Sequence, residues 1–228
     1  MTLHEYPEVE QGSEQWHDLR RGIVTASTIK SLITAKTVQV ASNIESRSLT
    51  ATLVAERVNG FTDDNYVSFD MARGHEIEPL ARELYAKTYG TPVTEMGFMI
   101  REDDRGYLFG YSPDGLVLDT GLIETKCRRP KEHIAAVIAD EVPAENMAQI
   151  QGGLFVTNRR WCDYLSYSPG MAMWRKRVYP DPAWFEAIAL AVEAFETAAA
   201  EMEAKYLAAI DGCPTTERIN YDVAGITF

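Results

Sequence analysis

Apolar residues recur three to four positions apart along 44–58 and along 70–89, and a glycine, Gly60 or Gly90, follows each segment. This spacing places the apolar side chains on one face of an α-helix, and glycine just past the last turn is a common helix end. A third segment of this kind, 182–210, begins at a proline and is followed by a glycine. The pattern therefore predicts three long helices.

Shorter helices are expected between these segments. Ser13 can cap a helix that runs through Arg20, because a serine hydroxyl accepts a hydrogen bond from an N–H of the first turn. Ser27 can cap a second helix over 28–34 in the same way. Two more helices are predicted at 131–139 and 144–156.

Strand-like segments alternate with the helices. They lie at 92–99, 107–111, 115–119, 122–127, 161–168 and 172–179. The turn residues Asp119, Thr120 and Gly121 predict that the third and fourth of these segments form a hairpin, and the last two are expected to form another. Helices that alternate with strands predict an α/β fold.

Length and composition suit one domain over 1–228, with a core at about 10–180 and a C-terminal helix and tail at 181–228. We find no internal repeat and no low-complexity linker. No apolar run approaches the ~20 residues that a membrane span needs, and the N-terminus lacks a secretion signal. Three widely spaced cysteines suit a reducing cytoplasm and match no zinc or iron–sulfur pattern.

The net charge of −12 argues against tight non-specific binding to a polyanion, but the charge is distributed unevenly. Residues 181–228 hold nine acidic and two basic residues, so this segment alone carries most of the excess. Basic clusters lie at 20–21, 126–131, 159–160 and 175–177. Because binding depends on the potential of one face, we expect a confined basic groove and an acidic exterior.

The most informative stretch is a turn that contains Asp114, followed by a predicted strand with Glu124 and Lys126 two positions apart. Successive side chains of a strand point to opposite faces, so Glu124 and Lys126 share one face. The predicted hairpin brings Asp114 near them. Two carboxylates and an ammonium group are therefore expected to converge.

Such a group suits divalent metal ions. Mg²⁺ prefers carboxylate, carbonyl and water oxygens, and usually binds through one or two protein carboxylates. A second ion about 3.5–4 Å from the first would stabilise both the attacking and the leaving oxygen of a phosphodiester displacement. Lys126 would orient the attacking water and favour its hydroxide form. The plainer alternative is a turn before a strand with an exposed Glu124 and Lys126.

Several segments, taken in order, resemble the lambda-phage-type alkaline exonucleases, the viral recombinase family of the nuclease superfamily named for its Pro-Asp…Asp/Glu-x-Lys motif. The matching segments are 10–12, 16–20, 22–27, 74–78, 111–116, 121–127 and 147–151. The resemblance implies a restriction-endonuclease-like core with a central mixed β-sheet flanked by helices. It also implies a magnesium-dependent 5′-to-3′ exonuclease that digests one strand of linear double-stranded DNA from 5′-phosphorylated ends. Mononucleotides would be released, and a 3′ single strand would remain for recombination.

The resemblance adds residues to the metal site. Glu78 matches a helix carboxylate that, with Asp114 and Glu124, holds two Mg²⁺ ions, for which Mn²⁺ can substitute. The main-chain carbonyl of Thr125 matches a further ligand, and Gln149 matches a glutamine near the reacting phosphate. The alternatives are a solvated helix glutamate at Glu78 and a buried glutamine bonded to the backbone at Gln149.

A second set of residues, Arg20, Ser27 and Ser112, matches the family's pocket for the terminal 5′-phosphate. An arginine fork fits phosphate oxygens, and a helix N-terminus at Ser27 would add N–H groups. Met71 matches an apolar wedge between the terminal base pairs. The alternatives are a surface arginine, a plain N-cap serine and a core methionine.

Three histidines and two tryptophans are expected to have structural roles. His17, His75 and His133 form no zinc motif and are expected to be surface or core histidines. Trp16 and Trp174 are expected in the core rather than as base-stacking platforms.

The resemblance also implies assembly and partners. Family members are ring-shaped homotrimers that act with a single-strand annealing protein in the cytoplasm of the bacterial host of a phage or prophage. The segments 182–210 and 219–228 are candidates for subunit packing or partner docking, and core packing is the alternative for the helix. Two other functions stay open: an endonuclease of the same superfamily, and a non-catalytic DNA-end-binding or annealing module.

Overall fold

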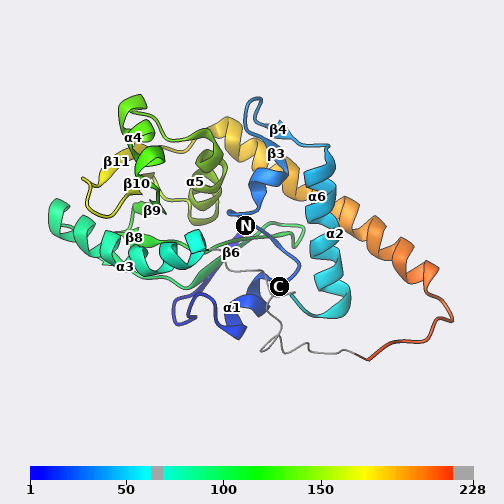
Figure 1. The fold of residues 1–228 in the computed structure, drawn as a ribbon. Coiled ribbons are helices and arrows are strands. Elements are labelled where there is room, and N and C mark those ends of the chain that lie inside the picture. The colour runs from blue at the N-terminus through cyan, green and yellow to red at the C-terminus, as the bar shows by residue number, and fades with distance from the viewer. Residues whose placement is uncertain (63–68, 218–228) are drawn as a thin grey trace.

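The structure, a computed structural model, describes residues 1–62 and 69–217, and in the second range side chains from residue 73 onward. It is a mixed α/β protein whose sheets are flanked by helices (Figure 1). The helices are α1 Glu14–Arg20, η1 Ile29–Ser31 (a 3-10 helix), α2 Ile44–Asn59, α3 Phe69–Tyr89, α4 Pro130–Ala139, α5 Ala144–Thr157 and α6 Pro182–Ala209. The strands are β1 Thr2–Tyr6, β2 Val24–Thr25, β3 Ile33–Thr34, β4 Gln39–Val40, β5 Val93–Thr94, β6 Phe98–Glu102, β7 Leu108–Tyr111, β8 Gly115–Val117, β9 Gly121–Cys127, β10 Trp161–Tyr167 and β11 Trp174–Val178.

The larger sheet has five strands in the order β11-β10-β9-β8-β5. Strands β9 and β10 are parallel and the other neighbours are antiparallel, so the sheet is mixed. Ile123 packs with Tyr85 of α3, whereas the adjacent Leu122 belongs to the cluster that contains Ile150 of α5. Because neighbouring strand residues face opposite ways, α3 covers one face and α5 the other. Helix α4 packs on β10 (Figure 1).

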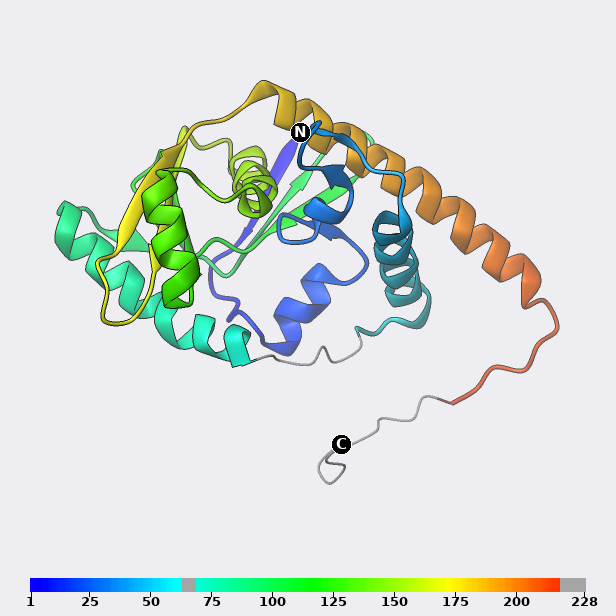
Figure 2. The same ribbon diagram turned by 45° about the horizontal axis from the view of Figure 1, so that its top comes forward.

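The second sheet has four strands in the order β1-β6-β7-β2, and β3 and β4 form a short hairpin. Helix α5 contacts strands of both larger sheets, and Ile150 and Leu154 on it are fully buried. The long helix α6 runs along one side of the molecule and packs against α2 and α5 (Figure 2). None of the described helices is long and apolar enough to cross a membrane.

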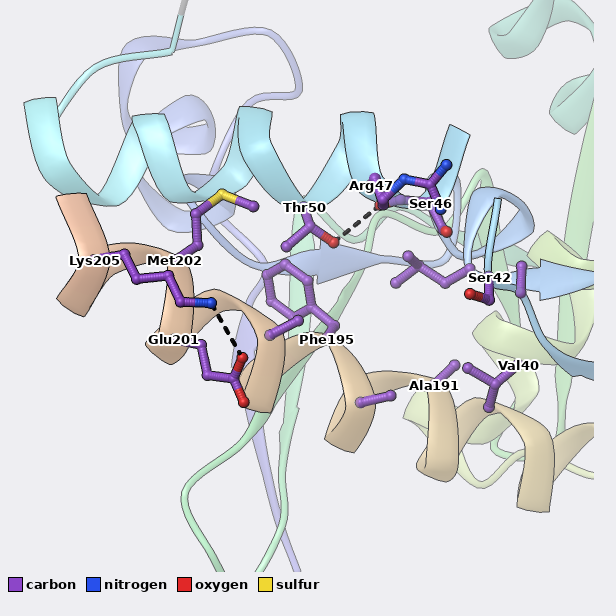
Figure 3. Close-up of a pocket in the computed structure, with 14 residues that line it drawn as sticks. Val40, Ser42, Ser46, Arg47, Thr50, Ala191, Phe195, Glu201, Met202 and Lys205 are labelled. Atoms are coloured by element: carbon purple, nitrogen blue, oxygen red, sulfur yellow. Dashed lines mark hydrogen bonds and ion pairs between the residues drawn. The ribbon is translucent and has the colours of Figure 1, made fainter. Parts of the chain in front are cut away.

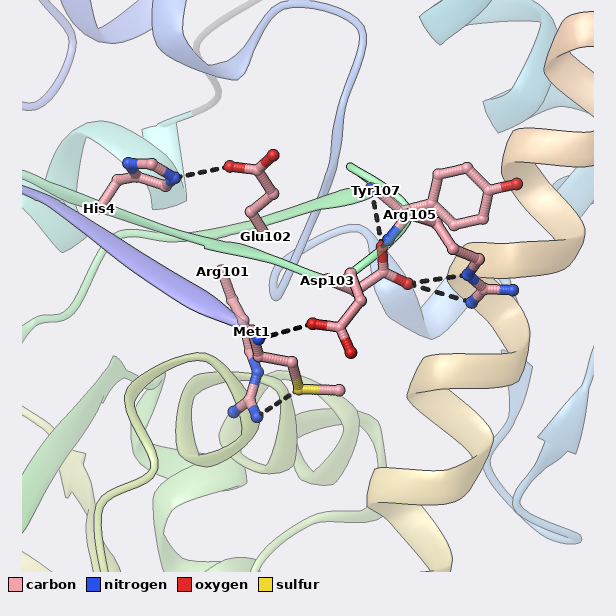
Figure 4. A network of polar contacts seen from close by, with 8 residues as sticks. Met1, His4, Arg101, Glu102, Asp103, Arg105 and Tyr107 are labelled. Carbon is pink, nitrogen blue, oxygen red and sulfur yellow. Dashed lines mark hydrogen bonds and ion pairs between the residues drawn. The ribbon is translucent and has the colours of Figure 1, made fainter.

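Polar contacts join the edge strand β1 to the turn region between β6 and β7 (Figure 4). His4 Nε2 lies 2.8 Å from Glu102 Oε2, across the β1–β6 pair. Asp103 Oδ1 accepts the main-chain N–H groups of Arg105 and Tyr107 at 2.8 and 2.9 Å. These contacts shape the β6–β7 turn, while exposed pairs such as His4–Glu102 contribute little to stability.

Most predicted elements are confirmed. The three long helices lie within one residue of their expected bounds, and Gly60 follows α2 in the left-handed conformation with φ of 68°. Ser13 caps α1, since its Oγ accepts the N–H of Trp16 at 3.2 Å. The predicted hairpin is the antiparallel pair β8–β9, and β10 and β11 form the other.

The helix expected over 28–34 is wrong. The chain forms only η1 there and then enters β3, and the cap residue of η1 is Thr28 rather than Ser27. The hydroxyl of Thr28 accepts the N–H of Thr25 at 3.0 Å and donates to the Thr25 carbonyl, which closes a turn. The β-branched residues in this segment also have weak helix propensity.

The single strand expected at 92–99 is also wrong. Its first part is β5 in the five-stranded sheet, and its last part begins β6 in the four-stranded sheet. The break lies near Gly97, where an added Cβ would come 1.9 Å from the Val9 carbonyl oxygen. Only glycine allows this close approach of two backbone segments.

Candidate active site

Asp114 lies in the turn between β7 and β8, and its Oδ2 accepts the main-chain N–H of Thr125 at 2.6 Å. Thr125 follows Glu124 on β9. The two halves of the predicted motif are therefore joined directly, and the Asp114 carboxylate is held beside the β9 segment that carries Glu124 and Lys126.

Glu124 is completely buried, so the alternative of an exposed strand glutamate is wrong. Its Oε1 lies 2.8 Å from Lys126 Nζ, and its Oε2 accepts the Tyr111 hydroxyl at 3.3 Å. Lys126 Nζ also donates to Gln149 Oε1 at 3.1 Å. The lysine thus bridges the β9 carboxylate and the amide on α5.

The backbone-bound glutamine on α5 is Gln151, not Gln149. Gln151 donates to the Tyr179 carbonyl at 2.9 Å and accepts the Asp181 N–H at 3.0 Å. Gln149 instead directs its oxygen to Lys126. Its side chain is therefore held beside Lys126.

Glu78 is not a solvated helix glutamate, because its side chain is 20% exposed and forms an ion pair with Arg82 one turn later on α3. Arg82 also donates to the main-chain carbonyl of Asp114 at 3.0 Å. The helix carboxylate and the Asp114 turn therefore share one guanidinium.

The space beside Gly74 is open among the described residues, so packing within the chain does not require a glycine there.

The carboxylates disturb one another's protonation. Burial raises the pKa of Asp114 well above its usual range, and repulsion from Glu124 and Glu78 raises it further. Burial also raises the pKa of Glu78, and Arg82 offsets part of that effect. For Lys126, burial alone would lower the pKa, but Glu124 and Asp114 outweigh burial and raise it. Lys126 is therefore a cation, and the negative charge around it is only partly compensated.

Within the described part of the chain, no three His, Cys, Asp or Glu side chains are already arranged to hold a metal ion. The carboxylates are bound instead by Lys126, Arg82 and the Thr125 N–H. The donor set still fits Mg²⁺, because it consists of hard oxygens in a site of excess negative charge. Glu124 Oε1 is buried, and its close polar partner among the described residues is Lys126 Nζ at 2.8 Å. A carboxylate oxygen has two lone pairs, so one of them remains for a metal ion.

The residues matched to the 5′-phosphate pocket lie close together. The Arg20 guanidinium stacks on Trp16, 3.9 Å from the ring centroid, and reaches Ser27 Oγ at 3.5 Å, a weak contact. Trp16 Nε1 donates to Ser112 Oγ at 2.8 Å. One indole ring therefore connects Arg20 and Ser112.

Arg20 lines a cavity of about 550 Å³, so it is not an ordinary surface arginine. Burial lowers the pKa of its guanidinium to about 10, and Glu56 offsets part of this. Among the described side chains, those of residues 1–62 and 73–217, no carboxylate oxygen lies within 4.0 Å of it. A buried guanidinium stacked on an indole and lacking a close counterion suits an anionic ligand such as phosphate.

A second cavity, of about 520 Å³, is lined by Glu78, Arg82 and Pro113. Gln11 and His75 line both this cavity and the one that contains Arg20. The Gln11 amide donates to the Pro113 carbonyl at 3.3 Å. The cavity beside Glu78 and the cavity beside Arg20 are therefore neighbours.

Sequence reasoning missed three residues at the site: Trp16, Tyr111 and Arg82. Trp16 packs against the Ile23–Phe98 cluster, as its predicted core role requires, but it also contacts Arg20 and Ser112. Arg82 lies four residues after Glu78, and Trp16 lies four before Arg20. This spacing on a helix predicts contact and is the signal that could have identified both.

The expected surface or core positions of the histidines and of the two tryptophans are confirmed. His17 and His75 are exposed, and the buried His133 pairs its Nδ1 with Ser166 Oγ at 2.8 Å. Trp174 packs against the main core cluster. The side chain of Met71, the proposed wedge, lies outside the described residues.

Several arginines of the predicted basic clusters are bound within the protein. Arg175 and Arg177 both bind the fully buried Asp163, and Arg21 binds Asp18 at 2.5 Å. Arg159 donates to main-chain carbonyls of the β8–β9 turn region.

A separate, largely apolar groove of about 410 Å³ lies between α2 and α6 (Figure 3). Phe195 and Met202 on α6 face Thr50 on α2 there, and Glu201 pairs with Lys205 at 3.7 Å. Phe195 and Ile188 of α6 are buried, so core packing of this helix is confirmed for one of its faces. This groove shares no lining residue with the two cavities above.

Three comparisons place this geometry among known proteins. Residues 15–160 match the family model of the YqaJ-like viral recombinase domain. An alkaline exonuclease from Laribacter hongkongensis, LHK-Exo, is 33% identical, with a TM-score of 0.75 over 88% of this chain and 98% of that chain. LHK-Exo has also been solved in complex with dAMP. A phage-related exonuclease from Haemophilus somnus 129PT shares the fold at 14% identity, with a TM-score of 0.63 over 83% of this chain and 99% of that chain. A search of curated proteins returned no match.

Proposed function

The chain belongs to the YqaJ-like viral recombinase family, and from this premise we propose that it is a magnesium-dependent 5′-to-3′ exonuclease. It digests one strand of linear double-stranded DNA from 5′-phosphorylated ends and leaves a 3′ single strand for recombination. The observation that carries the proposal is the 2.6 Å bond from the Thr125 N–H to Asp114, which sets a carboxylate beside Glu124 and Lys126.

Glu78, Asp114 and Glu124, with the main-chain carbonyl of Thr125, hold two Mg²⁺ ions in this proposal, and Mn²⁺ can replace them. When bound, such ions stabilise the attacking and the leaving oxygen of an in-line displacement at phosphorus. Burial and mutual repulsion raise the pKa of Asp114 and of Glu78, and a bound cation would favour their ionised forms, which supports this assignment.

Lys126 acts on the attacking water, and Gln149 positions Lys126. The ammonium group of Lys126 orients the water, favours its hydroxide form and stabilises negative charge as it develops. The Gln149 oxygen fixes the direction of that ammonium. The attacking water gives up one proton to solvent, and its oxygen forms a bond to phosphorus. The bond from phosphorus to the 3′ oxygen breaks, and the 3′ oxygen takes up a proton from solvent as the mononucleotide leaves.

Arg20, Ser27 and Ser112 bind the terminal 5′-phosphate and thereby set which phosphodiester is cut. Each cut exposes a new 5′-phosphate, so the shortened strand is again a substrate. The contacts of Trp16 with Arg20 and Ser112 support this pocket. The dAMP complex of LHK-Exo accords with release of mononucleotides. Met71 is retained as the proposed wedge between terminal base pairs.

The proposal includes assembly. A closed homotrimeric ring follows from head-to-tail contacts when the rotation closes, and it would keep the enzyme on its DNA. A single-strand annealing protein is the proposed partner, and the cytoplasm of a bacterial host is the proposed location. Light scattering on the purified protein tests the trimer.

Two experiments separate the proposal from its alternatives. An endonuclease of the same superfamily cuts closed circular duplex as well as linear duplex, whereas the proposed exonuclease requires an end. A non-catalytic DNA-end-binding or annealing module releases no nucleotide, and its binding does not change with Mg²⁺. Digestion of linear but not closed circular duplex, only with Mg²⁺, is the expected result.

A further inference from the structure

Arg82 is the cation that links two segments of the proposed metal site. On α3 it forms an ion pair with Glu78, and across 32 residues of sequence it donates to the Asp114 carbonyl at 3.0 Å. Its other terminal nitrogen lies 3.1 Å from Glu95 Oε1. The guanidinium fork therefore contacts the helix, the turn and the segment after β5 together.

The partners on the two sides of the guanidinium fork differ in their exposure to solvent. The side chains of Arg82 and Glu78 are 14% and 20% exposed, whereas that of Glu95 is 77% exposed. An exposed pair contributes little, but a largely buried arginine bound to a carboxylate and a carbonyl restrains both. The Glu78 and Asp114 side of the fork is therefore the one that fixes geometry.

We propose that Arg82 is a positioning residue that holds the Glu78 carboxylate and the Asp114 turn in the arrangement that receives divalent cations. This inference rests on the proposed function, because it concerns the same carboxylates. Arg82 contacts neither the Lys126 pair nor the Arg20 pocket by any bond of the described residues. It acts through Glu78 and Asp114, not on the substrate.

Removal of the Arg82 guanidinium should have opposite effects on metal affinity, depending on whether its charge or its positioning of the ligands matters more. A positive charge beside carboxylates repels a second cation, so its removal should tighten metal binding if charge alone mattered. Partners that orient metal ligands have the reverse effect, since their loss weakens metal affinity. The sign of the change therefore reveals which role Arg82 has.

The test is calorimetric titration of Mn²⁺ into the DNA-free protein. Arg82→Gln should weaken Mn²⁺ binding by about tenfold or more. Arg82→Lys keeps the charge but loses the planar fork, so it should also weaken binding. Glu95→Gln is the matched control, because it alters only the exposed side of the fork and should leave binding within about twofold.

Activity provides a second readout. Arg82→Gln should raise the Mg²⁺ concentration needed for half-maximal digestion while much of the rate returns at saturating Mg²⁺. If Arg82→Gln fails to fold, as circular dichroism would show, the Mn²⁺ affinity of Arg82→Lys decides the question.

Mn²⁺ affinity that is unchanged or tighter in both Arg82 variants would overturn the positioning role while leaving the proposed function in place. Absence of Mn²⁺ binding by the wild-type protein would instead remove the proposed function, and the role of Arg82 with it.

Discussion

The indole N–H of Trp16 donates a hydrogen bond to Ser112 Oγ at 2.8 Å. Because Ser112 lies two residues before Asp114 and Arg20 stacks on the same indole, the pocket proposed for the 5′-phosphate is fixed to the turn that carries a proposed metal ligand. A shift of either element would change the distance from the bound end to the cleavage centre.

Arg20→Ala should remove the preference for 5′-phosphorylated over 5′-hydroxyl ends. A hydrogen bond to a charged group contributes about 1.5–3 kcal/mol, so we expect the ratio of the two digestion rates to fall by roughly tenfold to a hundredfold. The measurement compares initial rates on duplexes that differ only in the terminal phosphate. Arg21→Ala is the control, since Arg21 pairs with Asp18 and should keep the preference. An unchanged preference in Arg20→Ala would mean that the pocket is misassigned.

Glu124→Ala or Lys126→Ala should abolish digestion while binding to DNA ends persists. Loss of one group that stabilises transition-state charge costs about 10²–10³ in rate, and Lys126 contacts both Glu124 and Gln149. Nucleotide release and electrophoretic binding assays on the same preparations check this. Substantial residual turnover would show that the catalytic residues lie elsewhere.

Lys126→Ala should also lower the free energy of unfolding in the presence of a chelator. The variant leaves Glu124 buried without its ion-pair partner, and breaking a buried pair in this way costs about 3–5 kcal/mol; the cost is reduced here because Lys126 is 30% exposed. Urea denaturation measures it. The double variant with Glu124→Gln should recover much of the loss, and no recovery would count against this cause.

The stabilisation by Mg²⁺ should grow as the pH rises. Folding raises the pKa of Asp114 and of Glu78, so without metal their stabilising contribution is complete below about pH 4 and is lost as the pH rises through the raised values. Bound Mg²⁺ favours the ionised carboxylates and offsets that loss. Melting temperatures with Mg²⁺ and with chelator should therefore diverge from acidic to alkaline pH. A constant difference would contradict the assignment, and the double variant Glu78→Gln, Asp114→Asn should abolish the divergence.

Gly153→Ala should destabilise the protein and impair activity. A Cβ there would lie 2.6 Å from Tyr111 Cζ, and the Tyr111 hydroxyl contacts Glu124. Overpacking of this kind costs about 1–3 kcal/mol. Gly74→Ala is the control for stability, because the space beside that helical glycine is open among the described residues. Equal melting temperatures for Gly153→Ala and the wild type would contradict the close packing of α5 on β7.

The local part of the site could be predicted from the sequence because its residues lie on one hairpin. Asp114, Glu124 and Lys126 fall within 13 residues, and the period of a strand determines which side chains share a face. The resemblance to lambda-type alkaline exonucleases is confirmed by the family match and by the identity with LHK-Exo.

The Arg20 pocket could not be derived from pattern. It depends on the parallel pairing of β2 with β7, in which Val24 lies opposite Phe109. No local signal specifies a pairing between segments so far apart in sequence. Only the family resemblance predicts that Arg20 and Ser112 belong to one pocket. The sequence also predicts a helix cap at Ser27, where Thr25 and Thr28 form a turn instead.

The basic clusters show a second limit of prediction from the sequence, which concerns surface charge. Arg175 and Arg177 alternate along β11 as an exposed basic face would, yet both bind the buried Asp163 of the neighbouring strand. Sequence period shows which side chains share a face, but not whether that face carries a buried acid. A cluster of arginines in the sequence is therefore not by itself evidence of a basic surface, because buried acids such as Asp163 can pair with its members.

We propose that three carboxylates hold divalent cations beside a 5′-phosphate pocket. The most direct test is digestion of a linear duplex labelled at either the 5′ or the 3′ end of one strand. With Mg²⁺, the 5′ label should appear at once as a mononucleotide, the 3′ label should remain in long strands, and chelator should stop release. Early release of the 3′ label, or release of either label in chelator, would contradict the account.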